Sequence, residues 1–249
     1  MSASVGVVLL AGGYGTRLYP LTKERPKALL PLRGGVILDW IWEAISRVPG
    51  RSKAVLVTNH RFARQFQAWI TRRGVAVEPV DDGTEAPEAR LGAVRDLLLG
   101  LERLEAGDDV LVLGTDNLFT WSLREFVEFG QAHRPAVSMV THRVGSMEEA
   151  RRCAVVELDG SRVVRFVEKP SKPSSLTVGL CIYYVPAPQR HVIGAFLSNG
   201  GTGDAPGHLI EWLVPRESVC GWSAGGEWFD VGSTDAYESV RRAWKQRRA

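Results

Sequence analysis

The sequence predicts an α/β fold built on a doubly wound, mostly parallel sheet, and three observations support that fold class. Through the first 150 residues, runs rich in β-branched residues alternate with segments of helical periodicity. The predicted strands are almost continuously apolar, as in a parallel sheet that helices cover on both faces. After about residue 150, short strand-like runs follow one another, which indicates a smaller β-rich part.

The elements follow in a regular order along the chain. The predicted strands of the first part are 5–10, 53–59, 75–80, 109–115 and 136–144. The helices between them are 36–48, 61–74, 89–104 and 122–133. Gly74 closes the second helix, and one apolar face of the third carries Leu91, Val94, Leu98 and Leu101.

The β-rich part begins with a predicted hairpin over 153–160 and 162–169 that turns at Asp159 and Gly160. The remaining predicted elements are a strand over 177–185, a helix over 207–214, a strand over 218–224 and a helix from Ser233 to Arg247. Since no Pro/Gly/Ser-rich linker interrupts this series, we expect a single domain over 1–249, with halves at 1–150 and 151–249.

Composition argues against several classes of protein. A net charge of +3 over 249 residues disfavours a dedicated nucleic-acid binder, and no apolar run reaches the roughly 18 residues of a membrane span. Three cysteines far apart fit neither a disulfide framework nor a zinc site and favour the reducing cytoplasm. The five histidines are scattered without metal-ligand spacing.

Glycines and cations follow the first predicted strand directly. Gly12, Gly13 and Gly15 stand where a doubly wound sheet binds its ligands, outside the carboxyl ends of the strands. Glycine lets backbone N–H groups approach a phosphate closely. Four cations come within the next dozen residues: Arg17, Lys23, Arg25 and Lys27. The pattern therefore predicts a polyphosphate site.

Two common phosphate motifs do not fit this loop. A nicotinamide dinucleotide site needs a third glycine and an acidic residue after the second strand, but that strand ends at Thr58 and Asn59. A P-loop needs a Gly-Lys-Ser/Thr triplet, which the chain lacks. Arginine and lysine packed into the loop suit a triphosphate and a leaving pyrophosphate, whose charge grows in the transition state.

The stretch LAGGYGTRLYPLTKERPKALLPL resembles the signature loop of the sugar-1-phosphate nucleotidyltransferases, including the glucose-1-phosphate thymidylyltransferases. Three further segments match that family in order: LVLGTDNLF, FVEKP and WFDVGSTDAYESV. The resemblance covers roughly residues 5–240. It implies a Rossmann-like nucleotidyltransferase fold, with a nucleotide-binding half at 1–150 and an acceptor-binding half at 151–249 that carries the second metal ligand.

The resemblance also implies a reaction. A phosphate oxygen of a sugar 1-phosphate attacks the α-phosphorus of a nucleoside triphosphate in line, which releases pyrophosphate and forms an NDP-sugar. No covalent enzyme intermediate is expected, so the protein positions the substrates and neutralises their charge. The thymidylyltransferase likeness favours dTTP or UTP. Arg17, Lys27 and Lys169 are the expected catalytic residues.

The other expected site residues divide by substrate. The nucleotide-binding set is Leu10, Ala11, Gly12, Gly13, Gly15, Thr16, Arg17, Lys27, Asp82, Gly83, Gly92 and Asp116. The acceptor-binding set is Asn117, Glu168, Lys169 and Gly179. Asp116 and Asp230 are the expected ligands of Mg²⁺, which commonly takes one or two carboxylates together with substrate phosphates.

Several alternatives stay open at this point. The acidic insert at 81–90 departs from the usual thymidylyltransferase loop, so a cytidylyl- or guanylyltransferase acting on a phosphorylated alcohol, cyclitol or phosphonate is a second reading. A non-catalytic, nucleotide-binding regulatory relative is a third, because fold alone does not guarantee function. The expected partners are the two substrates, without nucleic acid or membrane, in a monomer or homodimer.

Overall fold

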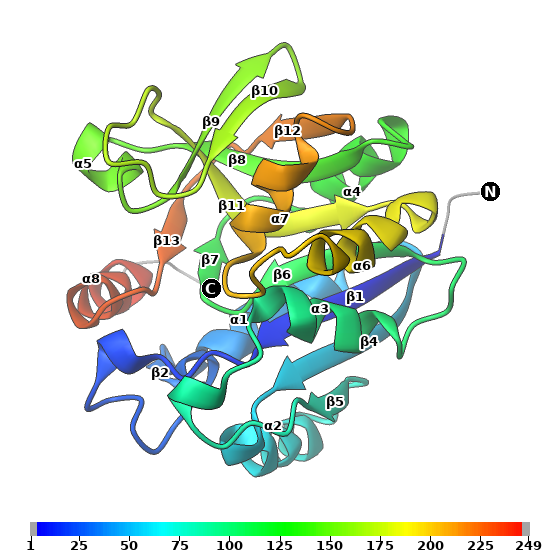
Figure 1. The fold of residues 1–249 in the computed structure, drawn as a ribbon. Helices are drawn as coiled ribbons and strands as arrows, with labels where there is room; N and C mark the ends of the chain where they lie inside the picture. Colours follow the sequence, from blue (N-terminus) through cyan, green and yellow to red (C-terminus); the bar gives the residue numbers. More distant parts are fainter. Residues whose placement is uncertain (1–3, 246–249) are drawn as a thin grey trace.

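A nine-stranded sheet runs through the computed structural model, which describes residues 4–245 (Figure 1). Its order is β5-β4-β1-β6-β11-β8-β12-β10-β9. The strands are β1 Val5–Ala11, β4 Arg51–Thr58, β5 Glu78–Asp81, β6 Asp109–Gly114, β8 Val137–Arg143, β9 Ala154–Asp159, β10 Arg162–Val167, β11 Thr177–Val185 and β12 Val219–Ser223. Two small ladders join β2 (Pro31–Leu32) to β3 (Gly35–Val36) and β7 (Asn117–Phe119) to β13 (Trp228–Asp230).

The direction of the strands divides the sheet into two parts. Strands β5, β4, β1 and β6 are parallel to one another, as the first half of the sequence predicts. Strand β11 then lies antiparallel between β6 and β8, although its residues come after β10 in the chain. The predicted α/β class is confirmed, with a sheet that is parallel in its first part and mixed beyond β6.

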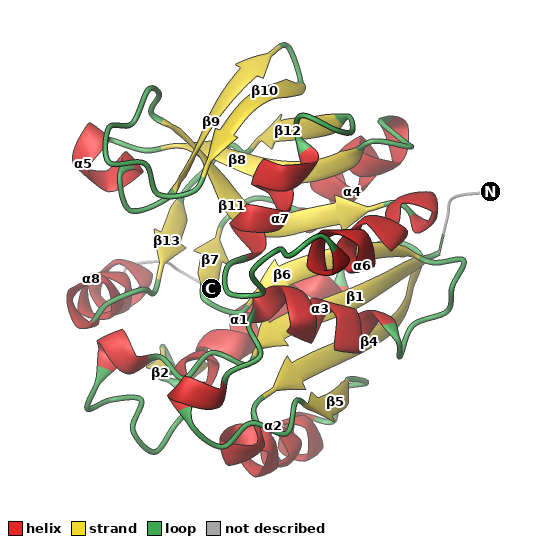
Figure 2. Ribbon diagram, in the orientation of Figure 1, coloured by secondary structure: helices red, strands yellow, loops and turns green. Residues whose placement is uncertain are grey.

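Eight α-helices accompany the sheet in the described residues (Figure 2). They are α1 Ile37–Ser46, α2 His60–Arg73, α3 Ala93–Leu101, α4 Leu123–Ala132, α5 Met147–Ala150, α6 His191–Ser198, α7 Pro206–Leu213 and α8 Thr234–Lys245. The sequence patterns did not predict α5 or α6. The predicted end of the last helix at Arg247 lies outside the described residues.

Helix α2 begins and ends at the residues whose chemistry favours those positions. The Asn59 side chain accepts a hydrogen bond from the Phe62 N–H at 3.1 Å, which caps the first turn. Gly74 has a φ of 60° and ends the helix, as predicted.

Helix α3 begins four residues later than predicted. Gly92, with a φ of 90°, precedes its first turn, and Pro87–Ala89 form a separate 3₁₀ turn. Leu97 is buried, whereas Leu98 is only half-buried, so the buried face is rotated relative to the predicted one. That rotation brings Asp96 to the buried side of the helix.

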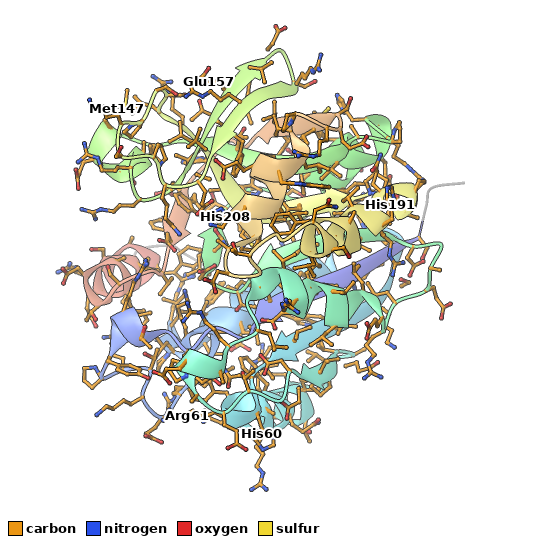
Figure 3. All side chains as sticks on the ribbon, viewed as in Figure 1. His60, Arg61, Met147, Glu157, His191 and His208 are labelled. Atoms are coloured by element: carbon orange, nitrogen blue, oxygen red, sulfur yellow. The ribbon has the colours of Figure 1, made fainter. Side chains whose placement is uncertain are left out.

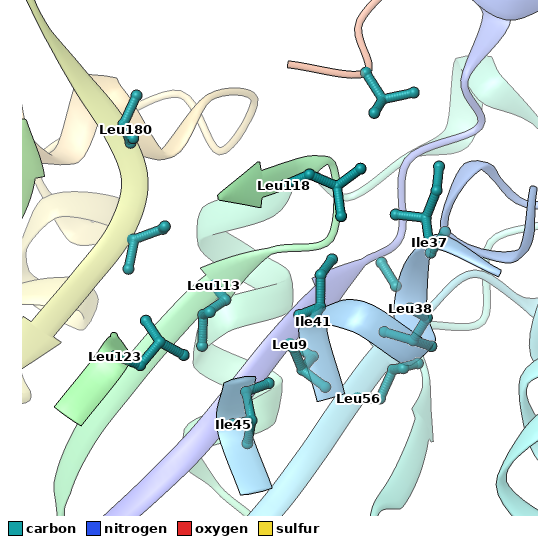
Figure 4. Packing of buried hydrophobic residues seen from close by; sticks show 14 of the residues in the cluster. Leu9, Ile37, Leu38, Ile41, Ile45, Leu56, Leu113, Leu118, Leu123 and Leu180 are labelled. Carbon is teal, nitrogen blue, oxygen red and sulfur yellow. The ribbon is translucent and has the colours of Figure 1, made fainter. Parts of the chain in front are cut away.

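The side chains of β1 alternate between two hydrophobic cores, one on each face of the sheet. Val5, Val7 and Leu9 pack with α1, α2, α4 and α8, and Figure 4 shows Leu9 beside Ile41 of α1. Val8 and Leu10 pack with α3, α6 and α7, which lie in front of the sheet in Figure 1. With both faces covered, the polar ends of the strands are where a ligand can enter.

Candidate active site

The glycine loop after β1 is held from two sides. Gly15 has a φ of 63°, a conformation that glycine adopts readily, and its carbonyl accepts a hydrogen bond from the buried Thr22 hydroxyl at 2.7 Å. The Asn59 side chain donates to the Gly12 carbonyl at 2.9 Å while it caps α2. These bonds fix the loop beside the N-terminus of α2.

A chain of hydrogen bonds joins this loop to the acidic insert. The Tyr14 hydroxyl donates to the Thr84 hydroxyl at 3.0 Å, and Thr84 donates in turn to Asp82 Oδ1 from its hydroxyl and its backbone N–H, each at 2.7 Å. Thr84 is buried, so the insert is anchored where it leaves β5. Asp82 is thereby held beside the glycine loop.

The β7–β13 ladder brings the two predicted metal ligands together. Asn117 pairs with Asp230 across the ladder, and the Val231 N–H donates to the Asp116 carbonyl at 3.1 Å. Asp116 and Asp230 are therefore neighbours in space although 114 residues separate them in the chain.

Lys27 is the cation of this carboxylate pair. Its Nζ lies 2.8 Å from Asp116 Oδ2. Burial is the largest single influence on Asp116 and opposes its ionisation, but the charge and hydrogen bond of Lys27, together with the Asp116 backbone and the Lys169 charge, lower the pKa of that carboxyl overall. Desolvation, followed by the Asp116 charge, raises the pKa of Asp230 to about 6. Two carboxylates that repel each other and face solvent suit a divalent cation.

The FVEKP segment forms the other wall. Lys169 has a φ of 45°, unusual for a residue with a side chain, and its Nζ lies 3.1 Å from Glu168 Oε1. The Glu168 side chain is only 11% exposed and packs against the first turn of α7 so closely that Gly207 has no room for a Cβ. Lys169 therefore extends toward the substrate side from a fixed position.

Two cavities meet at Asp116 and Lys27. The first, of about 240 Å³, extends from the glycine loop to Asp82 and α3. The second, of about 480 Å³, extends from Arg17 to Glu168, Lys169 and Asp230. The residues common to both are Gly13, Lys27, Asp116, Cys181, Asp204 and Pro206. Lys27 and Asp116 thus stand at the junction of two ligand-sized spaces.

The structure brings together nearly all of the expected site residues. Those that line the smaller cavity are Leu10, Ala11, Gly12, Gly13, Lys27, Asp82, Gly92 and Asp116. Those that line the larger cavity include Gly15, Thr16, Arg17, Asn117, Glu168, Lys169, Gly179 and Asp230. In the described part of the chain, the expected site residue Gly83 lines neither cavity. It is exposed and has a φ of 78°.

Sequence reasoning missed other residues of the two cavities. Asp96, Arg90 and Asp204 line the smaller one, and Arg152 and Cys153 line the larger one. Asp96 carried a usable signal, because it is a charged residue inside the apolar run AVRDLLLGL. The others lie in loops or at element ends, where no periodic pattern distinguishes a ligand-facing side chain from a solvated one.

Oxygen ligands are the metal donors that this site offers. In the part of the chain that the structure describes, no group of three or more His, Cys, Asp or Glu residues could hold a metal by itself. Figure 3 shows His60, His191 and His208 at separate places on the molecule. Asp116 and Asp230 fit Mg²⁺, which completes its shell with water and phosphate oxygens.

No helix within residues 4–245 has the length and apolar character of a membrane span.

The fold and the site residues together agree with one family of proteins. The chain belongs to the nucleotidyl transferase family, whose model matches residues 6–247. The resemblance seen in the sequence is thereby confirmed at the level of the family.

Individual relatives differ in the base that their names specify. Glucose-1-phosphate adenylyltransferase 1 of Vibrio cholerae is 24% identical over 96% of this chain and 66% of its own length. Mannose-1-phosphate guanylyltransferase 1 of Arabidopsis thaliana is 30% identical over 66% of this chain and 45% of its own length. The chain spans less than two thirds of the length of these relatives.

A solved structure shows the same fold. A UDP-glucose pyrophosphorylase in complex with UDP-glucose superposes with a TM-score of 0.81, at 18% identity, over 98% of this chain and all of that one.

Proposed function

We propose that this protein transfers a nucleoside monophosphate from a nucleoside triphosphate to a sugar 1-phosphate and so forms an NDP-sugar and pyrophosphate. The observation that carries the proposal is the junction of the two cavities at Lys27 and Asp116. One cavity suits the nucleotide and the other the acceptor, so the reacting phosphates would meet at the junction.

The residues at the junction account for the expected steps. An oxygen of the acceptor phosphate attacks the α-phosphorus, and the bond to the bridging oxygen of pyrophosphate breaks. Lys27 and Arg17 stabilise the charge that grows on the leaving pyrophosphate. Lys169 holds the attacking phosphate from the opposite wall, and Glu168 accepts from a hydroxyl of the acceptor. Asp116 and Asp230 would hold Mg²⁺, which screens the phosphate charges when bound.

The arrangement favours an enzyme over a non-catalytic relative. A regulator that only binds nucleotide has no use for a second cavity lined by cations. Here Arg17, Lys27 and Lys169 surround the carboxylate pair, and the charge of each lowers the pKa of Asp230. Lys169 also has a backbone conformation that costs free energy, which favours a functional reason for its placement.

Other parts of the sequence-based expectation remain predictions. These are the single domain with its nucleotide and acceptor halves, the cytoplasmic location, the monomer or homodimer, and dTTP or UTP as donor. The choice of base depends on Asp82 and Asp96, the acidic residues that line the smaller cavity beside the glycine loop.

A pyrophosphate-release screen tests the proposed function. The protein is incubated with Mg²⁺, each of five nucleoside triphosphates and a panel of sugar 1-phosphates, cyclitol phosphates and phosphonates. We expect pyrophosphate release that needs both substrates and is lost in Asp116→Asn. Nucleotide binding without release in any combination would favour the regulatory alternative instead.

A further inference from the structure

A buried carboxylate in the smaller cavity lacks a partner. Asp96 is 5% exposed and lies on the cavity wall, on the buried side of α3. Its Oδ1 atom is fully buried and accepts no hydrogen bond from residues 4–245. An unsatisfied buried acceptor is costly, and a charged one more so. Because Oδ1 is closed off from the cavity, the atom of this carboxylate that a ligand can reach is Oδ2, which lies beside Gly12.

The fold satisfies another buried aspartate completely, which shows what a structural carboxylate looks like in this chain. Asp109 is fully buried, and it accepts from the Tyr184 hydroxyl and from the Ala187 N–H at 2.8 Å. The Arg134 guanidinium lies 3.3 Å from the same carboxylate. Asp96 has none of these partners among the described residues.

A second carboxylate oxygen converges on the same point. Thr84 saturates Asp82 Oδ1 and leaves Oδ2 directed toward the glycine loop. A Cβ placed on Gly12 would lie 2.3 Å from Asp96 Oδ2 and 3.3 Å from Asp82 Oδ2. Two carboxylate oxygens thus meet above Gly12, where only glycine leaves them room. Burial, and then the charge of Asp82, raise the pKa of Asp96 to about 7.

We propose that Asp96 and Asp82 read the Watson–Crick edge of the base and select guanine, an inference that rests on the proposed function for the identity of this cavity. Guanine presents N1–H and the N2 amino group side by side, so it supplies adjacent donors to two carboxylates. Uracil and thymine present one N–H between two carbonyl oxygens, which the carboxylates repel. Adenine and cytosine present one amino group beside an unprotonated ring nitrogen.

The rim of the cavity complements the other edge of guanine. Arg90 lines the same cavity, and its Nε lies 3.2 Å from Asp204 Oδ1. Its Nη1 atom donates to the Pro87 carbonyl at 3.3 Å, so Nη2 is the group that we expect to donate to the O6 acceptor of guanine. Acceptors on one side of the cavity and a donor on the other match the polarity of this base.

Calorimetric titration with GTP, ITP and UTP in the absence of acceptor tests the inference. ITP is the discriminating probe, since hypoxanthine keeps N1–H and O6 but lacks the N2 amino group. We expect the wild type to bind GTP at least about 100-fold more tightly than UTP, because a site built to hydrogen-bond its ligand rejects an analogue that leaves it unpaired. ITP should lie between the two.

Two variants distinguish recognition of the base by Asp96 from a purely structural role of this residue. Asp96→Asn should weaken GTP binding by about 10- to 100-fold, the usual worth of a hydrogen bond to a charged group, and should leave UTP binding unchanged or strengthen it, because a repelling carboxylate is removed. Glu85→Gln is the matched control, because Glu85 is an exposed carboxylate of the same insert. It should leave all three affinities unchanged.

The inference is overturned if UTP binds as tightly as GTP, or if Asp96→Asn weakens every nucleotide equally. A lower melting temperature in Asp96→Asn with an unchanged GTP/UTP ratio would likewise assign Asp96 to folding. These readouts do not depend on turnover. If Asp96→Asn selectively weakened GTP binding but the protein showed no nucleotidyl transfer, the guanine preference would stand and the proposed function would be refuted.

Discussion

Replacing Lys27 by methionine removes a positive charge from the junction of the two cavities while keeping most of the side-chain volume. The Nζ atom lies 2.8 Å from Asp116 Oδ2, and the two side chains are 20% and 36% exposed. A partly exposed ion pair contributes about 0.2–1 kcal/mol to stability. For a chain of this size that corresponds to a fall in melting temperature of at most about 2–4 °C.

The effect of Lys27→Met on turnover should be far larger. In the proposed reaction Lys27 faces the departing pyrophosphate, and removal of one such donor costs about 10²–10³ in kcat. Because this charge develops only in the transition state, the loss should fall on kcat more than on KM. The assay is pyrophosphate release at saturating substrates, paired with a thermal melt of the same preparation.

Lys23→Met is the matched control for this experiment. Lys23 belongs to the same loop and is exposed, and its carbonyl accepts from Arg61. We expect Lys23→Met to retain wild-type kcat and stability. If Lys27→Met melted several degrees lower while kcat stayed at the wild-type value, Lys27 would be a structural residue and the account of the junction would fail.

Three further predictions follow from the site. Lys169→Gly should depress turnover while nucleotide affinity stays near normal, since glycine fits a φ of 45° and the fold is kept; calorimetry that showed lost nucleotide binding would assign Lys169 to the other substrate. Excess EDTA should abolish pyrophosphate release and added Mg²⁺ restore it, because the carboxylate pair needs a cation; full turnover in EDTA would remove the metal assignment. The unliganded wild type should lose stability relative to Asp96→Asn as pH rises from 4 to 8. The raised pKa of Asp96, about 7, means that the unfolded chain releases this proton first, and the difference at pH 8 should be on the order of 4 kcal/mol. Melting curves that shift in parallel over that range would show that Asp96 titrates normally.

The sequence predicted the parts of the fold that depend on local pattern. Strand β11 has the predicted bounds, and α2 ends at Gly74 as predicted. The position of β11 between β6 and β8 could not be predicted, because that pairing joins segments far apart in the chain. The same limit applies to β13 and β7, whose pairing makes Asp116 and Asp230 neighbours.

The parts of the candidate site that a sequence motif specifies could be predicted. The parts that depend on how helices and strands pack could not. The glycine loop was found from its residues, whereas the FVEKP segment was found from the family resemblance. Asp96 was missed because its role depends on the rotation of α3, which buries Leu97 in place of Leu98. The ion pair of Lys27 with Asp116 also joins distant residues, so it could not be read from the loop itself.

The central claim, that the two cavities join a nucleotide to an acceptor phosphate, is tested most directly with an isotope. A sugar 1-phosphate whose phosphate oxygens carry ¹⁸O is supplied with an unlabelled nucleoside triphosphate and Mg²⁺, and both products are analysed by mass spectrometry. We expect every labelled oxygen of the reacted acceptor in the NDP-sugar and unlabelled pyrophosphate in equal amount. Labelled pyrophosphate, or pyrophosphate released without an NDP-sugar, would contradict transfer at the junction of Lys27 and Asp116.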